Sequence, residues 1–170
     1  PFSPPMFKDR ILYKSPKRGD VVVFKTPADN RTDYIKRLIG LPGDTVQFID
    51  GELYLNENQI LKTIKSKDDT LYCGKSKIKV STYFEKLPEG KIYIASYRND
   101  YSYVNSDKFK IPKDHFFFLG DNRDCSKDSR FLGSVGYVHE NNLVGKAQFI
   151  FFSSDYRVGY FVEFWKWQKS

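Results

Sequence analysis

The dipeptide Asp50-Gly51 lies between two runs of strand-forming residues, and this arrangement constrains the fold more than any other feature of the sequence. TVQFI (45–49) precedes it and ELYLN (52–56) follows it. Asp-Gly readily adopts the backbone conformation of a tight two-residue turn between antiparallel strands. The segment therefore predicts a β-hairpin.

Other short apolar runs predict further strands. Aromatic residues make up 17% of the chain, with 15 Phe and 12 Tyr, and such residues favour strands over helices. The predicted strands are DVVVFK (20–25), DYIKRLIG (33–40), IYIAS (92–96), AQFIFF (147–152) and YFVEFWKW (160–167), with core-like sequence also at HFFFLGDN (115–122). We therefore expect a mostly β fold.

The domain organisation follows from a change of character along the chain. A length of 170 residues suits one domain, or one core domain with an insertion. From about residue 57 to residue 112 the sequence is polar and rich in Lys and Tyr, with weaker periodicity. We expect a β core built from 1–50 and 113–170, with a small β subdomain at 51–112 inserted into it.

The formal net charge of +7 leaves two interpretations open. The Lys residues are scattered among acidic residues, which favours general basicity without a dedicated partner. Attraction to an anionic membrane surface is the sharper alternative. Acidic residues interleaved at 120–130 argue against nucleic acid as a partner.

Cysteine and histidine give little support for a metal or cofactor site. Cys73 and Cys125 lie far apart and form no zinc-binding pattern, so we expect unpaired cysteines, with a disulfide as the alternative in an oxidising compartment. His115 and His139 are too distant in sequence to suggest a shared site, and we expect capping or surface roles. No cofactor and no metal ion are implied.

The ends of the sequence suggest a piece of a longer protein. No apolar run approaches the roughly 20 residues that a membrane-spanning helix needs. The sequence opens with PFSPP and has no initiating Met. We expect that a segment upstream of Pro1 has been removed.

Lys36 is the first candidate for chemistry. Strand alternation places it on the same face as Leu38, where its side chain would be partly buried. Burial disfavours the charged ammonium and lowers the pKa, and a neutral amine can act as a general base near pH 7. The alternative is a Lys whose stem packs on the strand while its amine reaches solvent.

The segment GDNRDCSKDSR (120–130) is the second candidate. It holds three Asp, two Ser and two Arg directly after an apolar run. Charges gathered so densely at a strand end need partners, which predicts a paired network. A polar surface loop is the alternative.

Four motifs in order give the two candidates a common context. They are RGDVVVFK (18–25), YIKRLIGLPGD (34–44), LGDNRDCSKDSR (119–130) and LVGKA (143–147). This ordered set resembles the bacterial type I signal peptidases, or leader peptidases, over residues 14–50 and 113–147. The resemblance implies a signal-peptidase-like β core and a serine endopeptidase that uses a lysine base.

The resemblance assigns roles residue by residue. Lys36 matches the general base, Ser126 the serine that orients this lysine, and Gly120 a glycine close to it. Four charged residues match two supporting pairs, Arg37 with Asp121 and Asp128 with Arg130.

The resemblance also implies a substrate. Asp33 and Tyr34 match a strand edge along which a signal peptide lies, and Val23 and Ile35 match positions that line shallow pockets. Alternation along an added strand would direct two alternate small residues into these pockets, giving cleavage after Ala-x-Ala. The implied partners are signal peptides of exported preproteins and the membrane surface. The implied location is the outer side of the bacterial inner membrane.

The sequence departs from the family at the nucleophile. The family carries it in a Ser-Met-x-Pro-Thr motif, which is missing here, and neither Ser3 nor Ser15 has a matching context. We therefore expect residues 1–170 alone to be inactive. Cys125 stands where the family commonly has Asn, and we expect a small structural residue there. The alternatives are a pilus or conjugation processing peptidase, a self-cleaving repressor-type protein, or a non-catalytic basic β module.

Overall fold

The computed structural model describes residues 15–100 and 104–147, and this part of the chain is mostly β, as predicted. The strands are β1 (Val21–Lys25), β2 (Asp33–Gly40), β3 (Thr45–Ile49), β4 (Glu52–Leu55), β5 (Asn58–Gln59), β6 (Leu61–Cys73), β7 (Ser76–Lys86), β8 (Ile92–Arg98), β9 (Phe109–Lys110), β10 (His115–Leu119), β11 (Val138–His139) and β12 (Leu143–Lys146). Two 3-10 turns, η1 (Arg123–Cys125) and η2 (Glu140–Asn142), complete the list. The predicted strand at 160–167 and nearly all of that at 147–152 lie outside the described residues.

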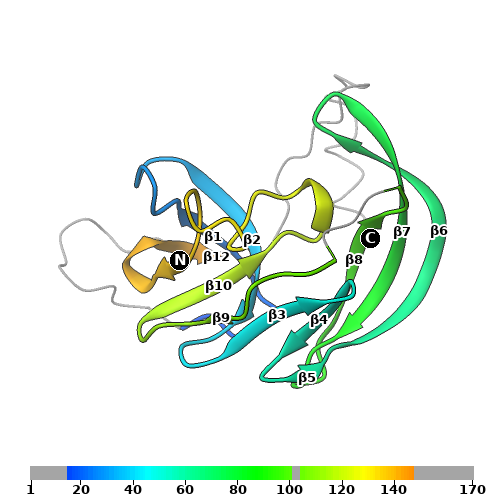
Figure 1. Cartoon of the computed structure of the whole chain (residues 1–170). Coiled ribbons are helices and arrows are strands. Elements are labelled where there is room, and N and C mark those ends of the chain that lie inside the picture. The colour runs from blue at the N-terminus through cyan, green and yellow to red at the C-terminus, as the bar shows by residue number, and fades with distance from the viewer. Residues whose placement is uncertain (1–14, 101–103, 148–170) are drawn as a thin grey trace, which may run out of the picture.

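The first sheet has five strands in the order β11-β10-β2-β1-β12 (Figure 1). Successive side chains along each strand point to opposite faces of the sheet, and one face carries a cluster of buried apolar side chains. These are Val22, Phe24, Leu38, Phe116, Phe118, Val135, Val138 and Leu143. Phe24 and Phe118 stack with ring centroids 4.6 Å apart, although their strands are not neighbours in the sheet. The buried face fixes the register of β2, the strand that carries Lys36.

Strand β2 is paired along only part of its length on one side. Residues 33–37 pair with β1, whereas β10 pairs only with Arg37, Leu38 and Gly40. Among the described residues, no strand therefore pairs with the β10 side of Asp33–Lys36. An unpaired strand segment of this kind can accept an extended peptide.

The predicted hairpin at Asp50-Gly51 is confirmed. Strands β3 and β4 pair from Val46↔Leu55 to Ile49↔Glu52, which leaves two residues in the turn. Asp50 and Gly51 both have positive φ, 49° and 78°. This is the conformation that an Asp-Gly turn favours. With β5 and β9 the hairpin forms a four-stranded sheet, β5-β4-β3-β9.

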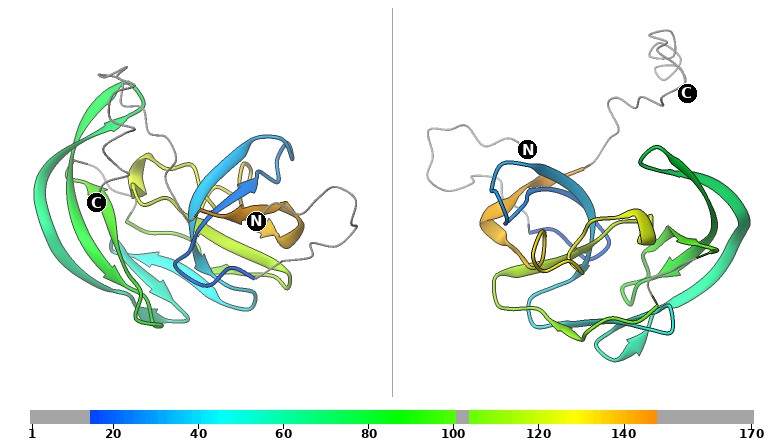
Figure 2. Two further views of the ribbon diagram at one scale, coloured as in Figure 1. Left: turned by 180° about the vertical axis from the view of Figure 1, so that it is seen from behind. Right: turned by 45° about the horizontal axis from the view of Figure 1, so that its top comes forward.

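The third sheet, β6-β7-β8, contains the two longest strands, of 13 and 11 residues. It curves along one side of the molecule, and the five-stranded sheet lies on the other (Figures 1 and 2). A second apolar cluster joins it to the other sheets through Ile39, Val46, Phe48, Leu87, Tyr93, Ala95, Phe117 and Leu119, among others. The long hairpin thus shares a core with the strands that carry the candidate site.

The predicted boundary at residue 50 falls between β3 and β4, which belong to one sheet. The division into a core and an insertion stays a prediction. Within the described ranges, the protein has no helix with the length and apolarity needed to cross a bilayer.

Candidate active site

Lys36 lies in the middle of β2, opposite Val22 of β1, with its side chain half-buried. Its Nζ is 5.6 Å from the centroid of the Tyr34 ring, on the same face of the strand. Burial lowers the pKa of the Lys36 ammonium, and this effect outweighs the opposing attraction of Asp128 and Asp121. The side chain thus has the property that the sequence predicted for a general base.

Gly120 borders the space next to the Lys36 amine. A Cβ added to Gly120 would lie 2.0 Å from Ser126 Oγ and 3.6 Å from Lys36 Nζ. The first distance is far below any normal contact, so only glycine leaves room for Ser126 here. The Lys36 amine and the Ser126 hydroxyl therefore border the same small volume above Gly120.

Ser126 directly follows η1 and directs its hydroxyl inward. Its Oγ is buried and makes no hydrogen bond to any of the residues that the structure describes. A buried hydroxyl without a partner costs free energy, so its presence in a folded protein calls for an explanation. A hydroxyl beside a partly desolvated amine can accept a hydrogen bond from it and so fix its direction.

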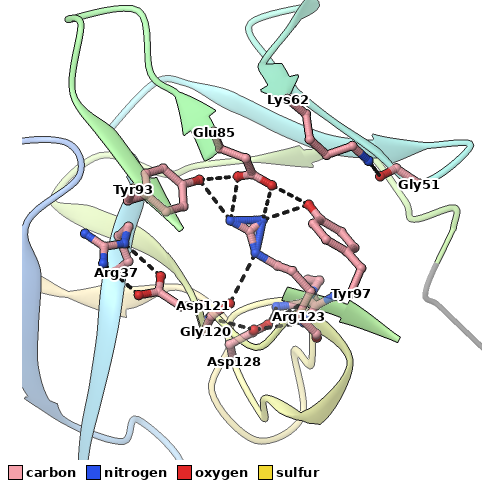
Figure 3. Close-up of polar contacts among 11 residues, drawn as sticks. Arg37, Gly51, Lys62, Glu85, Tyr93, Tyr97, Gly120, Asp121, Arg123 and Asp128 are labelled. Carbon is pink, nitrogen blue, oxygen red and sulfur yellow. Dashed lines mark hydrogen bonds and ion pairs between the residues drawn. The ribbon is translucent and has the colours of Figure 1, made fainter. Parts of the chain in front are cut away.

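Arg37 and Asp121 form a two-point ion pair next to this volume (Figure 3). Arg37 Nε donates to Asp121 Oδ1 at 2.7 Å and Nη2 donates to Oδ2 at 2.6 Å. Arg37 also donates to the carbonyl of Gly19, and its guanidinium lies 4.6 Å from the ring centroid of Tyr93. The pair joins β2 to the start of the 120–130 loop.

Asp128 and Arg130 form a second ion pair inside the same loop, and both side chains are buried. Arg130 Nε and Nη2 each donate to the Asp128 carboxylate at 2.9 Å. Asp128 Oδ2 also accepts from the Gly120 amide at 3.0 Å, and Arg130 donates to the carbonyl of Arg123. This arrangement closes the loop around Gly120 and Ser126. The structure thus contains both of the ion pairs expected from the resemblance.

The residues expected to bind substrate lie on β1 and β2. Val23 pairs with Ile35 across the two strands. Ile35 is 57% exposed, although its side chain is large and apolar. Asp33, Tyr34 and Ile35 all belong to the stretch of β2 whose β10 side is unpaired in the described part of the chain. An exposed apolar side chain next to an unpaired strand suits a bound extended peptide.

The expectation of unpaired cysteines is wrong. Cys73 and Cys125 form a disulfide with a Cα–Cα distance of 5.6 Å. The two residues are separated by 52 positions, so their sequence spacing gave no indication of the pairing. The β6-β7 hairpin brings Cys73 back to the residue before Ser126. Cys125 is therefore a cross-link and not merely a small residue.

His115 and His139 are also brought together. They are direct partners across β10 and β11, and their ring centroids lie 4.9 Å apart. His139 accepts from the amide of Asn141 and caps η2, the role expected for it. In the described residues no group of three or more His, Cys, Asp or Glu side chains could hold a metal ion.

Sequence reasoning missed a buried polar cluster behind the loop (Figure 3). Glu85 of β7 accepts hydrogen bonds from the hydroxyls of Tyr93 and Tyr97 of β8, and it forms an ion pair with Arg123 of η1. Tyr93, Ala95 and Tyr97 alternate along IYIASY, which indicates one buried face. The sequence did not indicate that the face meets an arginine.

The chain is similar to known proteins of one family. The model of the family described as signal peptidase, peptidase S26, matches residues 6–152. The signal peptidase I of Rickettsia typhi is 45% identical over 159 residues, which cover 88% of this chain and 57% of that protein. That of Rickettsia bellii is 43% identical over 158 residues, which cover 88% and 52%.

A crystal structure of a signal peptidase I from Enterococcus faecalis is 27% identical, with a TM-score of 0.46, and the match covers 79% of this chain and 98% of that one. The chain spans a little over half the length of the Rickettsia proteins. A family model that matches residues 6–152 and relatives at 45% identity lead to one conclusion. The chain belongs to the signal peptidase family, peptidase S26.

Proposed function

We propose that this chain is the catalytic part of an endopeptidase that removes signal peptides from exported precursors. The observation that carries the proposal is the shared volume above Gly120, which Lys36 Nζ and Ser126 Oγ border together. The lowered pKa of Lys36 and family membership support it.

In the proposed reaction, Lys36 acts as the general base. Its neutral amine accepts the proton of a serine hydroxyl as that oxygen attacks the scissile carbonyl. Ser126 accepts a hydrogen bond from the Lys36 amine, and this bond directs the lone pair of Lys36 Nζ toward the attacking serine. The bond between the carbonyl carbon and the leaving nitrogen then breaks, and Lys36 returns the proton to that nitrogen. Water, with Lys36 again accepting its proton, hydrolyses the ester left on the serine, which releases the signal peptide and restores the hydroxyl.

The attacking serine has to come from outside this sequence. No Ser-Met-x-Pro-Thr segment occurs between Pro1 and Ser170. We propose that an upstream segment supplies the hydroxyl and that residues 1–170 alone do not cleave precursors. Proton transfer requires the alcohol within hydrogen-bond reach of the amine.

The substrate is proposed to bind as an added strand along Asp33–Lys36. Main-chain hydrogen bonds would provide affinity, and Val23 with Ile35 would contact alternate side chains of the peptide. The two peptide side chains that contact Val23 and Ile35 should be small, because an added strand lies close to this apolar surface. Such precursors emerge from the membrane, so we propose that the site faces the membrane surface on its outer side.

The test is cleavage of an Ala-x-Ala precursor by the protein that includes its native upstream segment. We expect cleavage that stops in the Lys36→Ala variant and weakens strongly in Ser126→Ala. Residues 1–170 alone should be inert, and Lys36→Ala should leave their fold intact by circular dichroism. Cleavage by residues 1–170 would contradict the need for an outside serine. A folded, full-length protein without activity would overturn the proposed function.

A further inference from the structure

The loop that carries Ser126 is attached to the three-stranded sheet as well as to the sheet that carries Lys36. It leaves β10 and crosses to β8 (Figure 1). There Ser96 donates its amide to the carbonyl of Asp121 at 2.8 Å. The amide of Arg98 donates to Asp124 Oδ2 at 2.8 Å. The β6-β8 sheet thus contacts the loop by its backbone at two points.

Arg123 is the main side-chain attachment. It is 1% exposed, and its Nη2 lies 2.8 Å from Oε2 of Glu85, which is also 1% exposed. The hydroxyls of Tyr93 and Tyr97 each donate to Glu85 at 2.5 Å and accept from Arg123. Arg123 Nε donates back to the carbonyl of Gly120 at 3.2 Å. Every polar group of the cluster is therefore engaged (Figure 3).

Arg123 keeps its charge near neutral pH, and the two tyrosines keep their protons. Burial alone would lower the pKa of Arg123, but the combined effect of Glu85, Tyr93, Tyr97 and Asp121 outweighs it, and the pKa lies above its ordinary value. Burial raises the pKa of both tyrosines, so they stay protonated. A buried ion pair adds little stability over apolar packing of the same volume. The main effect of this ion pair is geometric, because it holds Arg123 where it fixes the position of the Gly120 carbonyl.

The disulfide is a second attachment at the other end of the turn. Cys125 directly precedes Ser126, and Cys73 ends β6 at the tip of the long hairpin. Arg123 fixes the start of η1 and the disulfide fixes its end. The backbone of Ser126 therefore has little freedom relative to the β6-β8 sheet.

We propose that Arg123, held by Glu85, and the Cys73–Cys125 disulfide position Ser126 against Lys36. The β6-β8 sheet is then a positioning element for Lys36. Cleavage by the full-length protein is then sensitive to reduction of the disulfide. This inference rests on the proposed function, because it explains how the fold holds Lys36 and Ser126 in the roles proposed there. Arg123 contacts neither the amine nor the hydroxyl in the structure, and it acts through the loop.

The first test measures the Lys36 amine without catalysis. The pKa of Lys36 is followed by NMR of its side chain, assigned with Lys36→Arg, in Arg123→Lys, Glu85→Gln and the double variant Cys73→Ser/Cys125→Ser. A looser loop exposes Lys36 to water, and because burial is the main cause of its lowered pKa, we expect the pKa to rise in each variant. Arg18→Lys is the matched control, since Arg18 is a largely buried arginine paired with Asp44, away from the loop.

The second test uses the full-length protein and an Ala-x-Ala precursor. We expect kcat to fall about tenfold or more in the three variants while KM changes less than about twofold, because the substrate is proposed to bind along Asp33–Lys36 of β2, which belongs to a different sheet from β6-β8. Dithiothreitol supplies two electrons and two protons to the disulfide and becomes a cyclic disulfide itself. It should lower kcat reversibly in the wild type and not at all in Cys73→Ser/Cys125→Ser.

Three outcomes separate the possibilities. If the variants lose thermal stability as Arg18→Lys does, with an unchanged Lys36 pKa, the cluster is only structural and the positioning proposal fails. If the Lys36 pKa rises as expected but the full-length wild type cleaves nothing, positioning holds and the proposed function fails. If KM rises and kcat does not, the sheet acts on substrate binding and the proposal is wrong.

Discussion

Arg37 on β2 and Asp121 in the loop after β10 hold each other through two parallel hydrogen bonds of 2.7 and 2.6 Å. The contact spans 84 positions of sequence and connects the strand that carries Lys36 to the loop that carries Ser126. A planar guanidinium matches a carboxylate in this way, and a lysine does not. The pair thus sets a distance as well as a charge balance.

Replacing Arg37 by Lys should therefore impair activity although the charge is kept. An ammonium lacks the rigid, planar pair of N–H groups that matches both carboxylate oxygens, which frees Asp121 to rotate. We expect kcat to fall about tenfold or more. Arg98→Lys, which affects the exposed pair with Asp100, should leave kcat unchanged. An active Arg37→Lys enzyme would show that the two-point geometry is dispensable.

The pH dependence of activity should follow Lys36. Because its pKa is lowered in the folded protein, the amine becomes neutral at a lower pH than an exposed lysine. Cleavage should therefore be present above this lowered pKa and be lost as the pH falls through it.

Lys36→Met should abolish cleavage, with a loss of about 100-fold or more. It should not lower the free energy of unfolding at pH 7, because it removes a charge that burial disfavours. A pH profile without a limb on the acid side would contradict Lys36 as the base.

Gly120→Ala should damage the site by crowding. The new methyl group would overlap Ser126 Oγ at 2.0 Å, so the loop must move. We expect a loss of about 1–3 kcal/mol in the free energy of unfolding, together with loss of cleavage. Gly133→Ala is the control, because an added Cβ there meets nothing within 4 Å. Urea unfolding and precursor cleavage measure the two effects.

Ile35→Trp should interfere with substrate and not with folding. Ile35 is 57% exposed on β2, so the fold tolerates a larger side chain within about 0.5 kcal/mol. The indole would occupy the surface that we assign to small residues of the peptide. We expect KM to rise about tenfold with kcat nearly unchanged. Ile49→Trp, at an exposed position of β3, should have no effect on KM. A rise in KM with both substitutions would argue against a local pocket.

Acid should unfold the protein partly through Asp20, which is 4% exposed and forms ion pairs with Lys91 and Lys146. Burial favours its neutral form, but hydrogen bonds from two lysines and a backbone amide outweigh this and lower the pKa of Asp20 to about 2. The folded state thus favours the carboxylate. Its contribution to stability is complete above the unfolded pKa near 4 and is lost as the pH falls toward 2.

Asp20→Asn should remove this dependence. We expect a loss of about 2 kcal/mol at pH 7 and a flatter profile of unfolding free energy between about pH 4 and pH 2. Asp50→Asn, at the exposed hairpin turn, should keep the wild-type profile, since Asn also tolerates the positive φ of that position. Urea unfolding at a series of pH values decides between them.

The features predicted from the sequence are mainly local ones. The Asp50-Gly51 turn depends on two residues, and the alternation around Lys36 depends on one strand. Both are visible without knowing what packs against them. The resemblance to the signal peptidases implied that the loop at 120–130 meets the strand of Lys36, and Asp121 of this loop pairs with Arg37 of β2.

The features that were missed depend on distant pairing. The cysteines are 52 positions apart and meet only because β6 and β7 form a long hairpin of defined length. Glu85 lies in the polar, Lys-rich segment from about residue 57 to residue 112, where the sequence shows only weak periodicity. It is buried because Tyr93, Tyr97 and Arg123 supply all of its partners. His115 and His139 meet because β10 and β11 pair, which no spacing rule indicates.

The reach of the β6-β7 hairpin also limits how the gene can change. Surface hairpins usually tolerate insertions and deletions at their tips. Here two extra residues in each strand would carry Cys73 about 7 Å farther along the hairpin, more than the Cα–Cα distance of 5.6 Å that the disulfide spans. The length of the hairpin therefore sets the distance from the shared core to the loop at 120–130. Within lineages that keep both cysteines, we expect its length to be inherited without insertions or deletions, whereas its exposed side chains can vary freely.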